Sequence, residues 1–262
     1  MVVLIGTSGW QYRHWKGLFY PGDLPQSLWL ARYAERFATV ELNNSFYRLP
    51  TLEAFERWRD GTPPGFVVAV KASRYLTHIK RLKDPAEPVA RLMGRAAGLG
   101  DRLGPVLVQL PPNMRADPEA LATTLSCFPP GARVAVEARH PSWFEDGAGS
   151  EVRSVLEARG AAWVMADGGP VDPPLWATAT WSYIRFHHGC GRPDSCYTRP
   201  ALEKWARRLA EVCGPRRDVY CYFNNDPHGC AVRDARLFAA AVQRAGLEPT
   251  RVPGRTETPV RG

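Results

Sequence analysis

Charged side chains stand at the ends of several short apolar segments of this 262-residue chain. Apolar segments of this kind are typical of strands buried in a parallel sheet, and the polar residues that end them are the first candidates for chemistry. Three of these residues could exchange protons with a substrate, namely Glu41, Glu137 and His187. Because carboxylates and imidazole are frequent general acids and bases, we predict that these three are catalytic.

Cations and amides end the same segments. The predicted anion-binding cations are Lys71, Arg139 and Arg185. Arginine can hold a phosphate or carboxylate through two parallel hydrogen bonds, and lysine binds it as a point charge. The other predicted substrate-binding residues are Asn43, Asn224 and Asn225, with Trp10 and Tyr47 as an aromatic wall. The set favours an enzyme that acts on a small anionic compound, for example a phosphorylated one.

Other functions stay open at this point. Glu41, Glu137, Asp167 and His187 could ligate a divalent ion in a metal-dependent hydrolase, but three neighbouring cations oppose such a site. We therefore expect no metal and no other cofactor. Lys71 could form a Schiff base if burial depressed its pKa, and the sequence gives no evidence of that burial. The charged residues could also be structural ion pairs.

A non-catalytic function is the remaining alternative. The net charge is +8, and the residues after Gly246 carry only three arginines and two glutamates of it, so the excess lies on the folded body. A basic body with aromatic loops could bind nucleic acid or a metabolite. No glycine-rich nucleotide motif and no nucleic-acid motif supports this alternative.

The segments that position these residues alternate between strand and helix patterns. Eight strands are expected, at 2–7, 39–42, 66–70, 105–110, 133–136, 163–166, 183–186 and 218–223, and the expected helices are 25–37, 52–58, 88–103, 118–128, 150–159, 200–212 and 232–245. Asp117 followed by proline predicts a helix start, and Gly160 predicts a helix end.

This alternation predicts a single (β/α)8 barrel, whose chemistry gathers at the C-terminal ends of its strands. Side chains two residues apart share a strand face, so Arg185 and His187 should point the same way, as should Glu137 and Arg139. Prolines between the sixth and seventh strands, at 170, 173 and 174, predict an irregular sixth unit. We expect residues 1–247 to form the barrel and 248–262 to form a disordered tail.

The N-terminus has no signal-peptide pattern, and no apolar stretch is long enough to span a membrane. A cytoplasmic location without membrane contact is therefore expected, and the oligomeric state is left open. Six cysteines show no CxxC spacing. The segment 187–196, with Cys190 and Cys196, could bind a metal or close a small disulfide, but we expect free thiols there.

Several strings of residues occur in the order found in a known family. They are GTSGW (6–10), ELNNSFYRLP (41–50), VKAS with a following TH (Lys71 to His78), QLPP (109–112), EARHPSW (137–143), YIRFHHG (183–189) and YFNND (222–226). The chain resembles the YecE-like family, a domain of unknown function, over nearly its whole length. The resemblance implies a TIM-like barrel, and it implies no established activity, substrate or cofactor.

Overall fold

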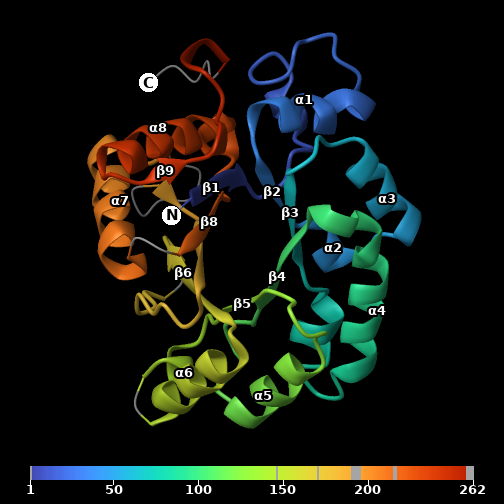
Figure 1. Cartoon of the computed structure of the whole chain (residues 1–262), viewed down its shortest axis with the longest axis vertical. Helices are drawn as coiled ribbons and strands as arrows, with labels where there is room; N and C mark the ends of the chain where they lie inside the picture. Colours follow the sequence, from blue (N-terminus) through green and yellow to red (C-terminus); the bar gives the residue numbers. More distant parts are fainter. Residues whose placement is uncertain (1, 146, 170, 190–195, 215–216, 258–262) are drawn as a thin grey trace.

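The computed structural model describes residues 2–145, 147–169, 171–189, 196–214 and 217–257. A parallel sheet of nine strands curls through the molecule in the order β2-β3-β4-β5-β6-β7-β8-β1-β9, and helices cover its outer side (Figure 1). Every pair of neighbouring strands is parallel. The predicted α/β class is confirmed.

The elements follow one another as the hydrophobic periodicity predicts. The strands are β1 (Val2–Thr7), β2 (Thr39–Leu42), β3 (Val67–Lys71), β4 (Leu103–Gln109), β5 (Val134–Glu137), β6 (Ala162–Asp167), β7 (Trp181–Phe186), β8 (Asp218–Phe223) and β9 (Glu248–Pro249). The helices are α1 (Trp29–Arg36), α2 (Asn44–Tyr47), α3 (Leu52–Asp60), α4 (Ala86–Ala96), α5 (Pro118–Ser126), α6 (Ala148–Arg159), α7 (Arg199–Cys213) and α8 (Cys230–Arg244).

Local signals in the sequence set two of the helix boundaries. The side chain of Asp117 accepts a hydrogen bond from the amide of Ala120 and caps α5, with Pro118 in the first turn. Gly160 adopts the left-handed conformation that ends α6, with φ of 58°. Both predicted helix boundaries are confirmed.

The two ends of the curled sheet approach each other between β1 and β2. Ser8 and Glu41 form one parallel bridge there. Gly6 permits this approach, because a Cβ at this position would lie 2.3 Å from the carbonyl oxygen of Thr39. Since the described residues of β1 and β2 share this single bridge, closure into a complete (β/α)8 barrel stays a prediction.

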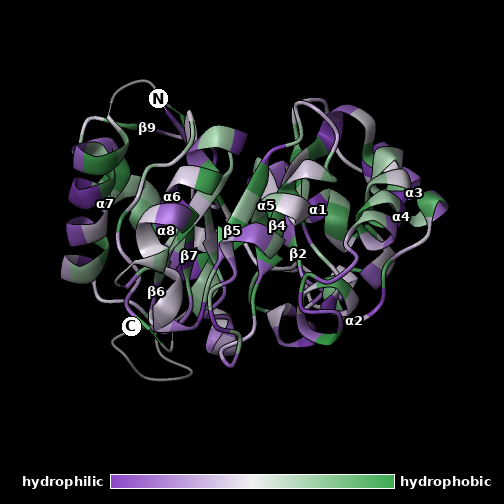
Figure 2. Cartoon of the chain, turned by 90° about the horizontal axis from the view of Figure 1, so that it is seen from below, coloured by the Kyte–Doolittle hydropathy of each residue, from purple (hydrophilic) through white to green (hydrophobic). Residues whose placement is uncertain are grey.

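The sheet separates two apolar layers. The larger one fills the space between the sheet and the outer helices, and it includes Val3, Val40, Leu121 and Phe238. The smaller one lies on the inner face and ends in aromatic residues of β7 and β8. Figure 2 shows the result, with helices that carry both hydrophilic and hydrophobic residues. Polar side chains on the inner face therefore lie next to this smaller apolar layer.

Two regions differ from regular strand–helix alternation. Between β6 and β7 the described residues form no helix, as the prolines predict. At the other end of the chain, residues 248–257 do not form the disordered tail expected from the sequence. Glu248 and Pro249 pair with β1, and Thr250 donates its amide to the carbonyl of Val3. These backbone hydrogen bonds, which composition does not encode, hold the segment against the sheet.

A disulfide joins Cys196 to Cys230, across 34 positions of sequence. The expectation of a free thiol is therefore wrong for Cys196, because the fold brings the start of α8 against the segment before α7. Cys127, Cys213 and Cys221 are free, and Cys190 lies outside the described residues. Disulfides are uncommon in a reducing cytoplasm, so the expected location stays a prediction. No helix in the described part of the chain is long and apolar enough to cross a membrane.

Candidate functional site

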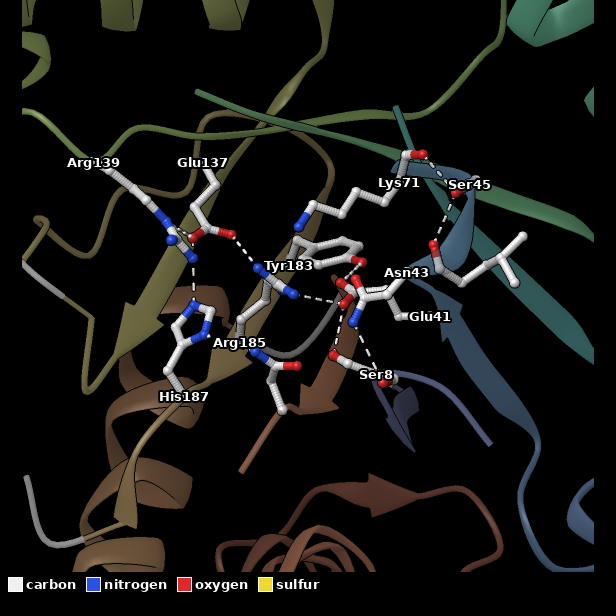
Figure 3. Close-up of polar contacts among 12 residues, drawn as sticks. Ser8, Glu41, Asn43, Ser45, Lys71, Glu137, Arg139, Tyr183, Arg185 and His187 are labelled. Carbon is white, nitrogen blue, oxygen red and sulfur yellow. Dashed lines mark hydrogen bonds and ion pairs between the residues drawn. The ribbon is translucent and has the colours of Figure 1, made fainter. Parts of the chain in front are cut away.

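A buried arginine joins two buried glutamates at the C-terminal edge of the sheet (Figure 3). Arg185 on β7 donates from Nη2 to Glu41 Oε1 over 2.8 Å and from Nη1 to Glu137 Oε2 over 2.6 Å. All three side chains are buried. Because β2, β5 and β7 each contribute one residue, only the folded sheet can assemble this triad. Arg185 was expected to bind the substrate anion, but both of its amino groups are already occupied.

Each carboxylate has further partners. Glu41 accepts hydrogen bonds of 2.6 Å from the hydroxyls of Ser8 and Tyr183. Glu137 accepts a hydrogen bond of 3.0 Å from Nε of Arg139. The inner faces of β5 and β7 therefore carry the residues that strand alternation assigns to them. Glu41 accepts three side-chain hydrogen bonds and Glu137 accepts two.

These partners hold both carboxylates in the ionised form. Burial alone would raise the pKa of Glu41, but Arg185 and the hydroxyls of Ser8 and Tyr183 outweigh it and lower the pKa. Burial likewise opposes ionisation of Glu137, and Arg185 and His187 hold its pKa well below the usual range. At neutral pH each group can accept a proton, and neither holds one to donate.

Lys71 is the cation of the site that has no carboxylate of its own. It ends β3, points toward Arg185 in Figure 3, and its Nζ lies 4.3 Å from the ring centre of Phe46. In the described part of the chain this ammonium group makes no hydrogen bond and no ion pair. Burial lowers the pKa of Lys71 to about 8, and repulsion by Arg185 adds to that effect. The neutral amine form of Lys71 is therefore well populated near pH 8, and a smaller fraction is present at pH 7.

His187 lies beside Glu137 and Asn224. Its Nε2 is 3.3 Å from Glu137 Oε1 without completing a hydrogen bond. Its Nδ1 is 3.2 Å from Nδ2 of the Asn224 side chain. Burial lowers the pKa of His187, although Glu137 opposes this shift. The imidazole is therefore neutral at pH 7, a form in which one ring nitrogen can accept a proton.

A cavity of about 220 Å³ opens beside Glu41, between the segment after β1 and the end of β2. Trp10, Tyr12 and Asn43 are among the residues that line it. Trp10 is only 3% exposed and packs edge-on against Trp58, so its main contact is structural. Asn43 donates to the carbonyl of Ser8 over 3.3 Å, and its buried Oδ1 has no hydrogen-bond partner. This oxygen is a buried acceptor whose hydrogen-bonding capacity is unused in the described part of the chain.

Two predicted site residues lie away from this cluster. Asn225 follows Asn224 directly and so takes the opposite face, where its amide donates to Asp234 on α8 over 2.7 Å. Tyr47 is 83% exposed and lies on the outer side of α2. The carboxylate of Asp167 acts on Tyr197, whose pKa is raised by burial and by this charge, and it does not join Glu41 and Glu137.

Three residues next to this cluster were not among the predicted site residues. Tyr183 lies two residues before Arg185, so strand alternation could have placed it on the inner face. Ser8 belongs to the GTSGW string but follows the strand, so its direction depends on the bridge to β2. His78 lies in a π-helical turn, Tyr75–Ile79, and packs against Phe46 with ring centres 5.0 Å apart. Burial, Lys71 and Arg74 lower its pKa.

The four residues considered as ligands in the metal-dependent alternative are Glu41, Glu137, Asp167 and His187, and they do not gather around one point. Among the described residues no group of three or more His, Cys, Asp or Glu side chains could hold a metal ion. Glu41 and Glu137 are instead joined through Arg185, whose charge would repel a cation. The donor set therefore gives the metal-dependent alternative no support.

Comparison with known proteins agrees with the motifs. The UPF0759 protein YunF of Bacillus subtilis is 26% identical over 279 residues, covering 95% of this chain and 98% of its own. The crystal structure of a DUF72 family protein from Thermotoga maritima is similar with a TM-score of 0.79 and 28% identity, covering 93% of this chain and 100% of that one.

Other solved structures share the fold at lower identity. A DUF72 family protein from Enterococcus faecalis has a TM-score of 0.81 at 17% identity, covering 97% of this chain and 98% of its own. SacUVDE has a TM-score of 0.55 at 8% identity, over 94% of this chain and 99% of its own. A family model described as "Protein of unknown function DUF72" matches residues 4–257. The resemblance inferred from the motifs is thus confirmed, and the chain belongs to the DUF72 family.

Proposed function

We propose that the protein is an enzyme that acts on a small anionic substrate beside Lys71. The observation that carries the proposal is the ammonium of Lys71, which lies among charged neighbours without a carboxylate partner. Two ionised carboxylates and three cations leave the cluster of Glu41, Lys71, Glu137, Arg139 and Arg185 with one positive charge. An anion would neutralise that charge in a partly buried setting, where the attraction is stronger than in water.

The proposal assigns different roles to residues that the sequence treats alike. Lys71 and Arg139 would contact the anion, since Arg185 is occupied by two glutamates. His187, or the neutral fraction of Lys71, would accept a proton from the substrate. Glu41 and Glu137 would hold Arg185 in place and contribute negative charge. The unpartnered Oδ1 of Asn43 and the amide of Asn224 would orient the substrate.

The same proposal takes the curled sheet as a (β/α)8 barrel closed between β1 and β2. Enzymes of that architecture place their chemistry at the C-terminal ends of the strands. The residues named here come from the ends of β2, β3, β5 and β7 and from the segments that follow them. Convergence of charged groups from separate strands at that edge supports a site over a set of isolated surface ion pairs.

A ligand screen tests the proposal. Purified protein would be heated with phosphate esters and carboxylates in turn, and a bound anion should raise the unfolding temperature. The anions that bind would then be followed by NMR for turnover. Lys71→Met should weaken the binding of these anions at least about tenfold, which is the loss of one charge-assisted contact. Arg207→Gln, on the exposed side of α7, removes one positive charge elsewhere and should not change binding. Unchanged affinity and turnover in Lys71→Met would overturn the proposal.

A further inference from the structure

A second cavity, of about 360 Å³, lies outside the Glu41–Arg185–Glu137 cluster, between α2, the π-helical turn Tyr75–Ile79 and α4. Four of its lining residues are arginines, namely Arg48, Arg74, Arg91 and Arg95, and no lining residue is acidic. The volume lies in the range of small-ligand sites. A wall with four guanidinium groups and no carboxylate selects for an anion.

Exposed apolar side chains collect at the same cavity. The described part of the chain has six large hydrophobic residues that are exposed, and three of them line this cavity. Tyr47 is 83% exposed, Ile79 60% and Tyr75 39%. Exposed aromatic and aliphatic groups gathered beside arginines are typical of a binding surface whose ligand is both anionic and aromatic.

The arginines differ in how firmly their own structure holds them. Arg95 donates to the carbonyls of Leu49 and Pro50, and Arg91 lies 3.4 Å from Glu87 and over the ring of Tyr75. Arg48 and Arg74 have no hydrogen-bond or ion-pair partner in the described part of the chain. These two are the ones that a ligand could engage without breaking an internal contact.

Positive charge continues from this cavity to Lys71. Phe46 lines the cavity, and Lys71 stands over its ring while His78 packs against its edge. Lys71, Arg74 and Arg139 all lower the pKa of His78, after the larger effect of burial, so their fields overlap at this point. A chain of anionic groups could therefore contact cations on both sides of Phe46.

We propose that this cavity binds one nucleotide of a single-stranded nucleic acid. The base stacks on Tyr47, because Arg91 already lies over the ring of Tyr75. The adjoining phosphates contact Arg48 and Arg74, and the strand continues past Phe46 toward Lys71. Stacking on aromatic side chains beside a basic groove is the general mode of single-strand binding. A strand fits better than a free nucleotide, because the cations extend beyond the cavity and Tyr47 is open to solvent. The inference goes beyond the proposed function, and the residues that hold the nucleotide, Tyr47, Arg48 and Arg74, are not among those assigned to that function.

Fluorescence anisotropy with a labelled 12-nucleotide oligothymidine tests this inference. The protein should bind the strand at 50 mM salt, and the affinity should fall steeply as salt is added. Tyr47→Ala should weaken binding between about 5-fold and 150-fold, the range found for loss of one stacked base. Tyr47→Phe keeps the ring and should bind like the wild type.

The charge is tested separately. Arg74→Gln should weaken binding and reduce the slope of log affinity against log salt by about 0.7, which is one phosphate contact on a single strand. Arg207→Gln removes the same charge from α7, on the other side of the molecule (Figure 1), and should change neither quantity.

Three outcomes would overturn the inference. They are no binding at 50 mM salt, equal losses in Arg74→Gln and Arg207→Gln, and wild-type affinity in Tyr47→Ala. Thymidine monophosphate is the competing ligand, and if it binds while the oligonucleotide does not, the cavity is a nucleotide site and the strand is excluded. Because Tyr47 and Arg74 do not belong to the Lys71 cluster, failure here leaves the proposed function intact, and the reverse also holds.

Discussion

Arg185 and Glu41 form an ion pair of 2.8 Å in which both side chains are at most 1% exposed. A buried pair of this kind adds little net stability over a well-packed apolar pair, because both charges lose their hydration. Removing one partner is a different matter, since the other charge is then left buried and unpaired. Here the loss of Arg185 would remove an ion-pair partner from two buried carboxylates at once, because Glu137 pairs with the same guanidinium.

Substitution of Arg185 should therefore be strongly destabilising. Arg185→Met keeps the aliphatic part of the side chain and removes the charge, and we expect the free energy of unfolding to fall by about 3–5 kcal/mol. Urea denaturation followed by circular dichroism measures this change. The exposed variant Arg207→Gln should stay within about 0.5 kcal/mol of the wild type. A loss below about 1 kcal/mol in Arg185→Met would show that the carboxylates find other partners.

The two glutamates also predict how stability responds to acid. Their pKa values are lowered in the folded protein, whereas both return to the usual value near 4.5 on unfolding. Their contribution is therefore fully present above pH 4.5, and it is lost as the pH falls toward the folded pKa, because the unfolded chain takes up protons first. Each group should add up to about 1.4 kcal/mol of lost stability per pH unit in this window.

Urea titrations at pH 7, 5, 4 and 3 measure that dependence. Glu137→Gln removes one of the two groups, so its free energy of unfolding should depend less steeply on pH below about 4.5. The variant will be less stable at pH 7, and the comparison concerns the slope alone. Parallel slopes in variant and wild type would mean that Glu137 does not titrate differently in the two states.

Strand alternation explains which parts of the site could be predicted. A period of two residues places Tyr183, Arg185 and His187 on one face of β7 and its extension, and the structure has all three facing the carboxylates. The same rule separates Asn224, which lies beside His187, from Asn225, which faces Asp234 on α8. The parallel sheet then brings the ends of distant strands to one edge, which is why the fold class and the convergence of these side chains follow from the sequence pattern.

Contacts between distant segments could not be predicted in this way. Nothing near Cys196 indicates that Cys230 is its partner, because the pairing is set by how α8 docks beside the segment before α7. The pairing of Glu248 and Pro249 with β1 rests on backbone hydrogen bonds that any sequence could make. The pairing of Arg185 with two glutamates likewise depends on side-chain directions in three strands, which the sequence pattern does not define.

The lowered pKa of Lys71 predicts the pH dependence of anion binding. With a pKa of about 8 the ammonium is mostly charged at pH 7 and mostly neutral at pH 9. The affinity for an anion found in the screen should therefore fall as the pH rises through about 8. Isothermal titration calorimetry at pH 6.5, 8 and 9.5 measures this fall. Lys71→Arg stays charged over this pH range, so its affinity for the anion should depend much less on pH. If Lys71→Arg shows the same pH dependence as the wild type, Lys71 does not belong to the binding site.

The disulfide between Cys196 and Cys230 should stabilise the protein against unfolding. It closes a loop across 34 positions, for which chain entropy predicts a contribution of about 3–4 kcal/mol. Cys196→Ser should lower the free energy of unfolding by that order, and the reducing agent should then have no further effect on the variant. Cys127→Ser, at a free thiol, is the matched control. If reducing agent leaves the urea midpoint of the wild type unchanged, the two cysteines do not form the bond in solution.

The indole of Trp15 should report the titration of Asp226, a buried carboxyl that follows β8. Trp15 donates from Nε1 to Asp226 Oδ1 over 2.6 Å, and His14 Nε2 lies 2.7 Å from Oδ2. Burial raises the pKa of Asp226 to about 6, although His14 and Trp15 act to lower it. Protonation weakens the acceptor, so the Trp15 indole N–H resonance should shift with a midpoint near pH 6.

Two variants test this assignment. Asp226→Asn should abolish the shift, because no titrating group then contacts the indole. His14→Ala removes a neighbour that favours the ionised carboxylate, so the midpoint should move above pH 6. Trp15→Phe identifies the resonance by its disappearance from the NMR spectrum. Loss of His14 alone makes ionisation of Asp226 harder and so raises the midpoint. A midpoint below pH 6 in His14→Ala would therefore contradict this account of the Asp226 pKa.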